Sequence, residues 1–271
     1  MATITAADVK SLRDATGAGM MDAKKALTEA DGDFDAAVEI LRVSGQAKMA
    51  NRSDRSASNG LVAAAGSTVI QLAAETDFVA KNAEFMTLAD DIARAVDAAG
   101  ADGVEAALQV SLPSGKTVAE AISELSAKIG EKLELAAAAT YSGPVTIYLH
   151  KRSQDLPPQV GVMVEYSGGD DEFAKGLAMQ IAAMSPAYVT RDEVPDHVLE
   201  NERKIATLSA QEEGKPEHII PRIVEGRLGS FYKEVCLVEQ GSIAEDKKTV
   251  GQLLADNGVE VKRFVRFATG A

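Results

Sequence analysis

The sequence predicts an α+β protein, in which a small N-terminal helical domain precedes two related α+β subdomains and a helical hairpin insert. Three observations predict this fold class. Apolar residues recur at helical spacing through residues 4–44, with no strand-like run among them. A strand pattern that leads through a polar segment into an amphipathic helix occurs twice, near 60–96 and near 161–184. A second helical pattern, interrupted once, fills residues 195–235.

These patterns divide the chain of 271 residues into successive parts. We expect a three-helix domain at 1–45, a linker at 46–59, a core N-subdomain at 60–140, and a core C-subdomain at 141–271 with the hairpin inserted at about 195–235. The linker is predicted because its residues are rich in Ser, Asn and charge and lack any apolar period.

The first helix is predicted by a capping box. Thr5 and Asp8 stand at the spacing in which each side chain accepts a backbone N–H from the other residue. Val9 and Leu12 then form the buried stripe of this helix. The glycines of residues 17–19 are typical of a tight turn after it.

Two further helices follow in the N-terminal domain. One is expected from about Met20 to Ala30, with Leu27 facing inward. Asp33 can cap the other helix, and Gly45 can end it. The apolar stripe expected on this last helix comprises Phe34, Ala37, Val38 and Leu41.

The first α+β subdomain begins with strand material at 60–75, which leads into Thr76, Asp77, Phe78 and Val79. A long helix follows, and Lys81 and Asn82 are typical of its cap region. The inward stripe of that helix comprises Phe85, Leu88, Ala89, Ile92 and Val96. We therefore expect Phe78 to lie on a loop between a strand and a helix.

Two interpretations of Phe78 are open. A large apolar ring on a loop commonly covers its own core, but it can also be presented for insertion into another protein. The second subdomain repeats the pattern with a strand at 161–166, a polar segment from Asp170 to Phe173, and a helix. Phe173 is in register with the stripe of that helix, which comprises Leu177, Ile181 and Met184. Phe78 has no such register, so its role is less easily assigned to packing.

The remaining elements follow from local signals. Thr117 and Glu120 form a second capping box, and Gly130 ends the helix that it opens. The inward residues of this helix are Val118, Ile122, Leu125 and Ile129. Strands are expected at Lys132–Tyr141 and Val145–Leu149, with a turn between them. A short helix near 249–255 and a strand at 259–267 complete the fold.

Residues 195–235 predict two antiparallel helices. The first carries Val198, Ile205 and Leu208 at roughly heptad spacing, and Gly214–Pro216 interrupts the pattern. The second carries Ile220, Ile223, Val224, Leu228 and Phe231. Either the hairpin lies on its domain, or it projects as a coiled coil that mediates self-association.

Composition restricts the class of partner and the compartment. The net charge is −13 and the pI about 4.8, which disfavours a general nucleic-acid or anionic-membrane binder. Cys236 is the single cysteine and cannot form an internal disulfide, and no signal peptide opens the chain, so we expect a reducing cytoplasm. No apolar run approaches the ~20 residues that span a bilayer. The three histidines, His150, His197 and His218, are scattered, so we expect no metal site.

No catalytic constellation stands out, and we expect neither enzymatic activity nor a cofactor. The chain has no G-x-S-x-G motif, no Cys/His pairing and no Walker-type phosphate loop. The acidic clusters at 90–91 and 170–172 are typical of solvated helix surfaces or caps.

Two motifs, residues 76–82 (TDFVAKN) and 17–27 (GAGMMDAKKAL), resemble the bacterial elongation factor Ts family. Weaker matches follow in the family's order at 127–131, 224–227, 248–254 and 264–267, so the resemblance covers almost the whole chain. It implies that the N-terminal helices form a ubiquitin-associated-like (UBA-like) domain and that the hairpin is the family's coiled-coil insert. Some members continue with a C-terminal helical module beyond the position of Phe267, and this sequence does not.

The resemblance implies a guanine-nucleotide exchange factor for elongation factor Tu in translation elongation, without covalent chemistry of its own. In this family Thr76, Asp77, Phe78 and Val79 would displace the partner's Mg²⁺, which promotes GDP release. The positions that match partner contacts of the family are Arg13, Met20, Met21, Ile129, Gly130 and His150.

From the residues alone, Met20 and Met21 can be partly buried in the helical domain, or exposed as an adaptable partner surface. We expect no direct contact with nucleic acid or membrane, and a possible homodimer through the 195–235 hairpin. The alternative function is a scaffold whose N-terminal helices bind ubiquitin-like or other partners.

Overall fold

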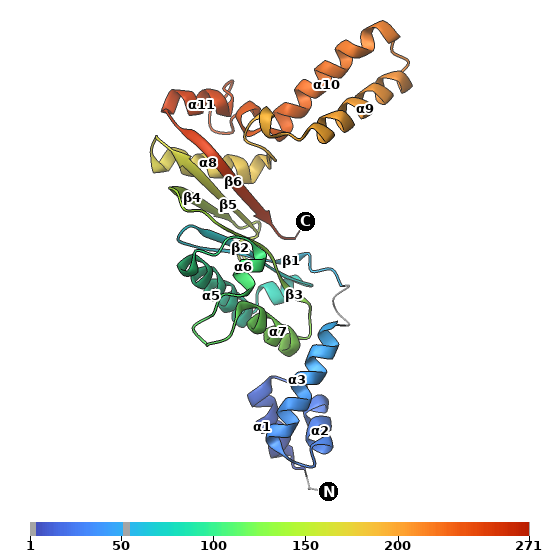
Figure 1. The fold of residues 1–271 in the computed structure, drawn as a ribbon, viewed down its shortest axis with the longest axis vertical. Coiled ribbons are helices and arrows are strands. Elements are labelled where there is room, and N and C mark those ends of the chain that lie inside the picture. The colour runs from blue at the N-terminus through green and yellow to red at the C-terminus, as the bar shows by residue number, and fades with distance from the viewer. Residues whose placement is uncertain (1–3, 51–54, 271) are drawn as a thin grey trace. The chain divides into compact units, whose positions relative to one another are not determined.

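The structure is a computed structural model that describes residues 4–50 and 55–270. The fold is α+β, as predicted, with N-terminal helices and two three-stranded sheets (Figure 1). By their contacts, the residues form two compact units. Unit 1 contains Met1–Thr140, Lys151–Val160 and Phe267–Ala271, and unit 2 contains Tyr141–His150 and Gly161–Arg266. The predicted division into three domains and a linker stays a prediction.

Unit 1 opens with three helices, α1 (Ala6–Thr16), α2 (Met20–Glu29) and α3 (Phe34–Ala50). The capping box of α1 is confirmed, because Thr5 and Asp8 each accept a backbone N–H from the other. The three helices enclose a small core of Val9, Leu12, Ala23, Ala26, Leu27 and Ala37.

Two details of α3 differ from the prediction. Phe34 is 39% exposed, because side chains tilt toward the N-terminus of a helix and a first residue points past the small core. Gly45 does not end the helix, which runs on to Ala50 into the predicted linker. Residues 46–50 consist of helix-favouring types, which outweigh the roughly 1 kcal/mol that a glycine costs in a helix.

The sheet of unit 1 has the order β1-β2-β3. Its strands β1 (Asn59–Ala65), β2 (Thr68–Ala74) and β3 (Leu133–Thr140) are antiparallel neighbours. The helices that pack with it are α5 (Ala83–Ala99), α6 (Val104–Leu108) and α7 (Val118–Ile129). Phe85 and Ile92 of α5 are fully buried, which confirms the predicted stripe.

The outer edge of β1 is bonded to two segments that come much later in the chain. The Val62 N–H donates to the Pro158 carbonyl at 2.8 Å, and the Gly270 N–H donates to the Ser58 carbonyl at 2.7 Å. The Thr269 hydroxyl, which is buried, donates to the Gly60 carbonyl at 3.2 Å. These bonds explain why both late segments group with unit 1, although the sequence placed them in the C-subdomain.

Unit 2 is built on a sheet with the order β4-β5-β6. Its strands are β4 (Val145–His150), β5 (Val160–Ser167) and β6 (Glu260–Ala268). Its other elements are α8 (Asp171–Met184), η1 (Arg191–Glu193), η3 (Leu237–Glu239) and α11 (Val250–Asn257). Leu177 and Ile181 of α8 are buried as predicted and Phe173 is half-buried, but Met184 is 46% exposed. Met184 is the last residue of the helix, where the chain turns away at Ser185.

The hairpin consists of α9 (Asp196–Glu212) and α10 (Ile220–Val235), joined through η2 (Glu217–Ile219) (Figure 1). The seam between the helices buries Ala206, Ala210, Ile220, Val224 and Leu228. The predicted inward positions Ile205 and Leu208 of α9 are therefore wrong, since Ile205 is 51% and Leu208 55% exposed, while Val198 is half-buried. Small alanine side chains, four residues apart on one face, form the α9 side of the seam instead. Within the described residues, no helix has the length and apolarity needed to cross a membrane.

Candidate functional site

The segment between β2 and α5 forms a separate turn of helix. Thr76 caps α4 (Asp77–Ala80), and its hydroxyl oxygen accepts the Val79 N–H at 3.5 Å. Asn82 then caps α5, and its side-chain oxygen accepts two backbone N–H groups. Two successive caps explain why the predicted loop is helical instead. We call Thr76–Val79 the aromatic turn.

Phe78 of the aromatic turn is 80% exposed. Val79 and Ala80, by contrast, are buried, and Val79 belongs to the core of unit 1. The interpretation of Phe78 as a cover over its own core is therefore wrong. Burying such a ring would stabilise the fold by about 2–3 kcal/mol, and the turn leaves this contribution unused. Beside the ring, Asp77 lies 4.0 Å from Lys81 in an exposed ion pair.

The aromatic turn is held to the chain segment that follows α7. Both carboxylate oxygens of Glu131 accept hydrogen bonds from Thr76, one from the hydroxyl at 2.8 Å and one from the backbone N–H at 3.1 Å. In the opposite direction, the Lys132 N–H donates to Glu75 Oε1 at 2.6 Å. We call this pair of reciprocal contacts the carboxylate clamp. The sequence did not single out Glu131, although it lies in one of the family motifs, 127–131.

The carboxylate clamp brings together two sets of predicted site residues. Ile129 ends α7, and Gly130 caps it in a left-handed conformation with φ of 89°. Both residues are half-buried and directly precede Glu131, so they lie beside the aromatic turn. One stretch of unit 1 therefore carries the predicted insertion residues and two of the predicted partner contacts.

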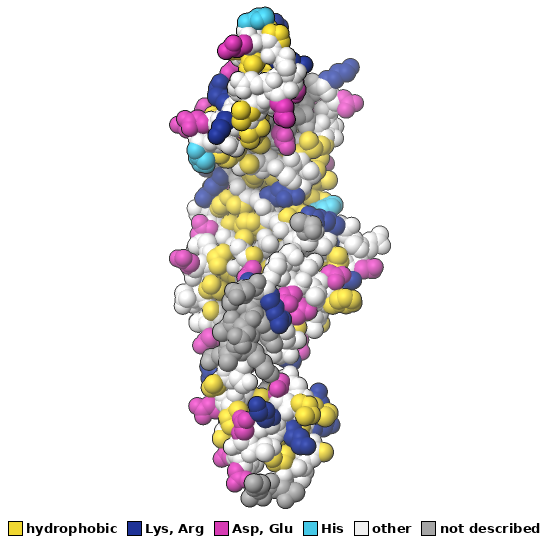
Figure 2. Space-filling view, turned by 90° about the vertical axis from the view of Figure 1, so that its right-hand side faces the viewer, with side chains coloured by type: hydrophobic (Ala, Val, Ile, Leu, Met, Phe, Trp, Pro, Cys, Tyr) yellow, Lys and Arg dark blue, Asp and Glu magenta, His cyan; other side chains and the backbone are white. Residues whose placement is uncertain are grey.

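The other predicted contacts of unit 1 lie on the N-terminal helices. Met20 is 61% and Met21 76% exposed, which favours the interpretation as an exposed pair over the partly buried one. Arg13 and Met20 line a groove of about 490 Å³ together with Lys10 and Lys24. Figure 2 shows hydrophobic, basic and acidic side chains mixed on the N-terminal helices, in the lower part of the view. Asp14 lines the same groove, so both signs of charge surround its apolar residues.

His150 belongs to unit 2, where it is exposed at the end of β4. Its ring nitrogen Nδ1 lies 3.0 Å from the Tyr148 hydroxyl. The structure therefore places His150 in a different compact unit from the aromatic turn.

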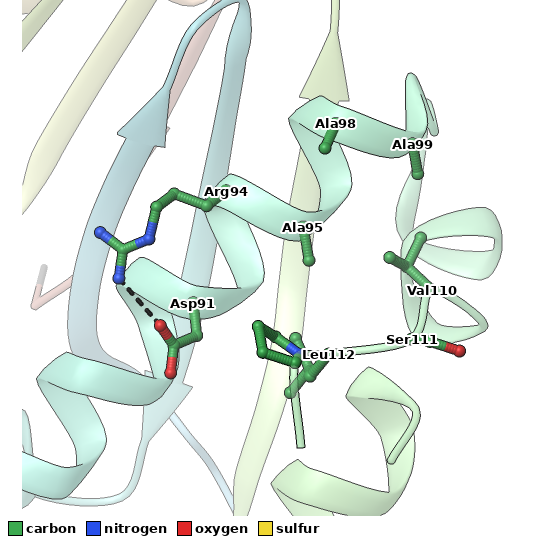
Figure 3. Close-up of a pocket in the computed structure, with 9 residues that line it drawn as sticks. Asp91, Arg94, Ala95, Ala98, Ala99, Val110, Ser111 and Leu112 are labelled. Carbon is green, nitrogen blue, oxygen red and sulfur yellow. Dashed lines mark hydrogen bonds and ion pairs between the residues drawn. The ribbon is translucent and has the colours of Figure 1, made fainter. Parts of the chain in front are cut away.

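A shallow hollow of about 680 Å³ lies along α5 in unit 1 (Figure 3). Its walls are small apolar side chains, among them Ala95, Ala98 and Val110. The charged pair Asp91 and Arg94 lies at its edge, with 2.8 Å between the bonded atoms. Ser111 also lines the hollow, and the Asp91 carboxylate is bonded to Arg94.

Two observations concern the titratable and metal-binding side chains of the described residues. Over residues 4–50 and 55–270, no group of three His, Cys, Asp or Glu side chains is placed to hold a metal ion. Cys236 is fully buried, and burial raises the pKa of its thiol from 9.0 to about 11. A thiol in this state is protonated at neutral pH and unreactive.

The α+β fold thus presents an exposed aromatic ring on a turn that a carboxylate holds in place, a feature suited to contact with another protein. The family model described as elongation factor TS matches residues 75–271. Elongation factor Ts of Cutibacterium acnes is 65% identical over 267 residues, which cover 98% of this chain and 99% of the relative. Elongation factor Ts of Salinispora tropica is 55% identical over 274 residues, with 100% and 99% covered. The chain belongs to the elongation factor Ts family, a family of translation elongation factors, and the resemblance found in the sequence is confirmed.

Proposed function

We propose that this protein promotes the release of GDP from elongation factor Tu, by inserting the aromatic turn beside the partner's Mg²⁺ site. Membership in the elongation factor Ts family supports the exchange role. The observation that carries the insertion step is the 80% exposure of Phe78 on a turn whose neighbours Val79 and Ala80 are buried.

Exchange of this kind needs binding energy and no covalent step. A nucleotide held with nanomolar affinity is bound by about 12 kcal/mol, and a factor that prefers the nucleotide-free partner lowers this affinity. The coupling is reciprocal, so GDP weakens the factor as much as the factor weakens GDP. Burial of Phe78 in the partner would contribute about 2–3 kcal/mol, enough to move side chains that hold Mg²⁺. Asp77 would disturb the polar groups around the ion.

The remaining predicted contacts supply affinity in this proposal. The exposed Met20 and Met21 and the nearby Arg13 form an adaptable apolar and basic surface on the N-terminal helices. Ile129 and Gly130 extend the contact around the aromatic turn, and His150 adds a contact from unit 2. The net charge of −13 favours a protein partner in the cytoplasm over nucleic acid or an anionic membrane.

The test is stopped-flow release of labelled GDP from elongation factor Tu over a range of factor concentrations. Phe78→Ala should lower the maximum release rate about tenfold or more, with a modest change in affinity. Phe34→Ala is the matched control, since it removes another exposed phenylalanine ring of unit 1. A Phe78→Ala protein that releases GDP at the normal rate would show that the insertion step is wrong. A full-length protein that does not accelerate release would instead favour the scaffold function.

We also propose that the hairpin mediates self-association through the outer face of α9. The residues at heptad spacing, Val198, Ile205 and Leu208, lie outside the seam of the hairpin, and the last two are more than half exposed. Sedimentation of the wild type and of Ile205→Lys with Leu208→Lys tests this proposal. A dimer that persists in the double variant would contradict it.

A further inference from the structure

We propose that Glu131 is a positioning residue for nucleotide release, which fixes the direction in which Phe78 leaves the surface. This inference rests on the proposed function of the aromatic turn. Glu131 does not itself reach the partner in this account. It acts through Thr76, which both of its carboxylate oxygens hold.

The helix α4 is too short to hold its own orientation. It spans Asp77–Ala80, a single turn, and a helix of this length is not stable alone. Its own cap is weak, because the Val79 N–H lies 3.5 Å from the Thr76 hydroxyl oxygen, at the long limit for a hydrogen bond. The orientation of the turn therefore depends on contacts with the rest of unit 1.

Two such contacts lie on opposite sides of Phe78 in the sequence. After it, Val79 and Ala80 are buried against the core. Before it, Thr76 is held by Glu131 through two bonds to one charged group, which are stronger than bonds between neutral groups. Because neighbouring residues of a helix point about 100° apart, this anchoring directs Phe78 away from the core.

Glu131 is itself fixed in place. Its backbone carbonyl accepts the Ser126 hydroxyl at 2.6 Å, and Ser126 is buried. The next residue, Lys132, donates its N–H to Glu75, which adjoins Thr76 on the other side. The carboxylate clamp therefore joins two rigid points of unit 1, the end of β2 and the end of α7. A preorganised turn loses less conformational freedom when it enters a partner.

The experiment measures GDP release and affinity for full-length variants, alone and combined with Phe78→Ala. Glu131→Ala should slow the maximum release rate about tenfold, with an affinity change below about threefold. Glu131→Gln should be closer to the wild type, because the amide can still accept one bond from Thr76. Thr76→Val, which removes only the hydroxyl bond, should slow release about threefold and serves if Glu131→Ala fails to fold.

The matched control is Glu84→Ala. Glu84 pairs with Lys128 at 2.7 Å in the same unit, so this variant removes a carboxylate and an ion pair without touching Thr76. We expect it to release GDP at the wild-type rate. Its thermal stability shows how much the loss of an ion pair alone destabilises the protein.

The decisive measurement is the GDP release rate of the double variant, Glu131→Ala with Phe78→Ala. If Glu131 acts by orienting Phe78, Glu131→Ala should add less than about a twofold effect once Phe78 is alanine. A full additional effect in that background, or wild-type release by Glu131→Ala and Thr76→Val, overturns the positioning role alone. Wild-type release by Phe78→Ala overturns both this inference and the proposed function.

Discussion

Both compact units contain a strand that leads into a long helix through a capped segment, yet the two segments differ in length and in what they expose. In unit 2, only residues 168–170 separate β5 from α8, and Phe173 is half-buried. In unit 1, residues 75–82 separate β2 from α5, and Phe78 is 80% exposed.

The caps show which residues correspond. Asp170 accepts the Phe173 N–H at 2.7 Å, and Asn82 accepts the Phe85 N–H at 3.2 Å. In each unit, the cap residue is thus followed three positions later by a phenylalanine that faces the core. The counterpart of Phe173 is therefore Phe85 and not Phe78. Phe78 belongs to an additional turn that packing of the fold does not require.

The largest effect on stability is expected at Phe85, which the comparison places in the core of unit 1. Phe85→Ala should destabilise unit 1 by about 3–5 kcal/mol, since it leaves a cavity at a fully buried ring. Amide hydrogen exchange of β2 across a urea series measures this loss. If the free energy of unfolding falls by less than about 1 kcal/mol, Phe85 is not the core counterpart of Phe173.

Cys236 provides a probe for unit 2 alone. Burial raises the pKa of its thiol to about 11, so at pH 8 its thiolate fraction should be about a hundredfold lower than that of an ordinary thiol. Iodoacetamide should therefore label Cys236 only when unit 2 opens, and mass spectrometry measures the rate. Because the folded pKa is raised, this thiol stabilises unit 2 below about pH 9, and the contribution is lost as the pH rises toward 11. Fast labelling of the folded protein would contradict the burial.

Phe173→Ala should cost less than Phe85→Ala, about 1–3 kcal/mol, because its ring is only half-buried. The loss should appear in unit 2, as faster labelling of Cys236 in urea. All five tyrosines also lie in unit 2, so tyrosine fluorescence follows the same transition. GDP release should stay within about twofold of the wild type. A strong loss of exchange would mean that the two segments share a function.

The smallest effect on stability is expected at Phe78. Phe78→Ala should change the free energy of unfolding by less than about 0.5 kcal/mol, because the ring is exposed. The same variant is expected to show the largest loss of GDP release. A small effect on stability together with a large effect on release would separate Phe78 from the core phenylalanines Phe85 and Phe173. Urea unfolding with Phe34→Ala as a reference checks it. A loss above about 1 kcal/mol would show that Phe78 packs in solution.

Local signals in the sequence predicted much of the fold. The caps at Thr5, Asn82 and Thr117 and the stop at Gly130 are confirmed, because each depends on residues within one helical turn. The inward face of α9 could not be predicted the same way. Ile205 and Leu208 have the right spacing for a seam, but the close approach of α10 selects the alanines.

The candidate site was only partly predictable, for a similar reason. The motif at 76–79 indicated the aromatic turn, but the exposure of Phe78 depends on which phenylalanine the core of unit 1 accepts. The bonds between Glu131 and Thr76 join residues 55 positions apart, and no local pattern reveals such a pairing. Glu131 also has no apolar or catalytic signature, so only its geometry marks it.

The two late segments bonded to the outer edge of β1 are synthesised long after β1 itself. The Thr269 hydroxyl and the Gly60 carbonyl are separated by 209 positions. At the usual pace of about 5–20 residues per second, the ribosome needs about 10–40 s to bring them together. Until the segment around Pro158 and then residues 269 and 270 are made, parts of the β1 edge lack their bonding partners, and an unpaired strand edge is a surface on which chains can pair wrongly. The edge of β1 is therefore completed only after residues 269 and 270 have been synthesised.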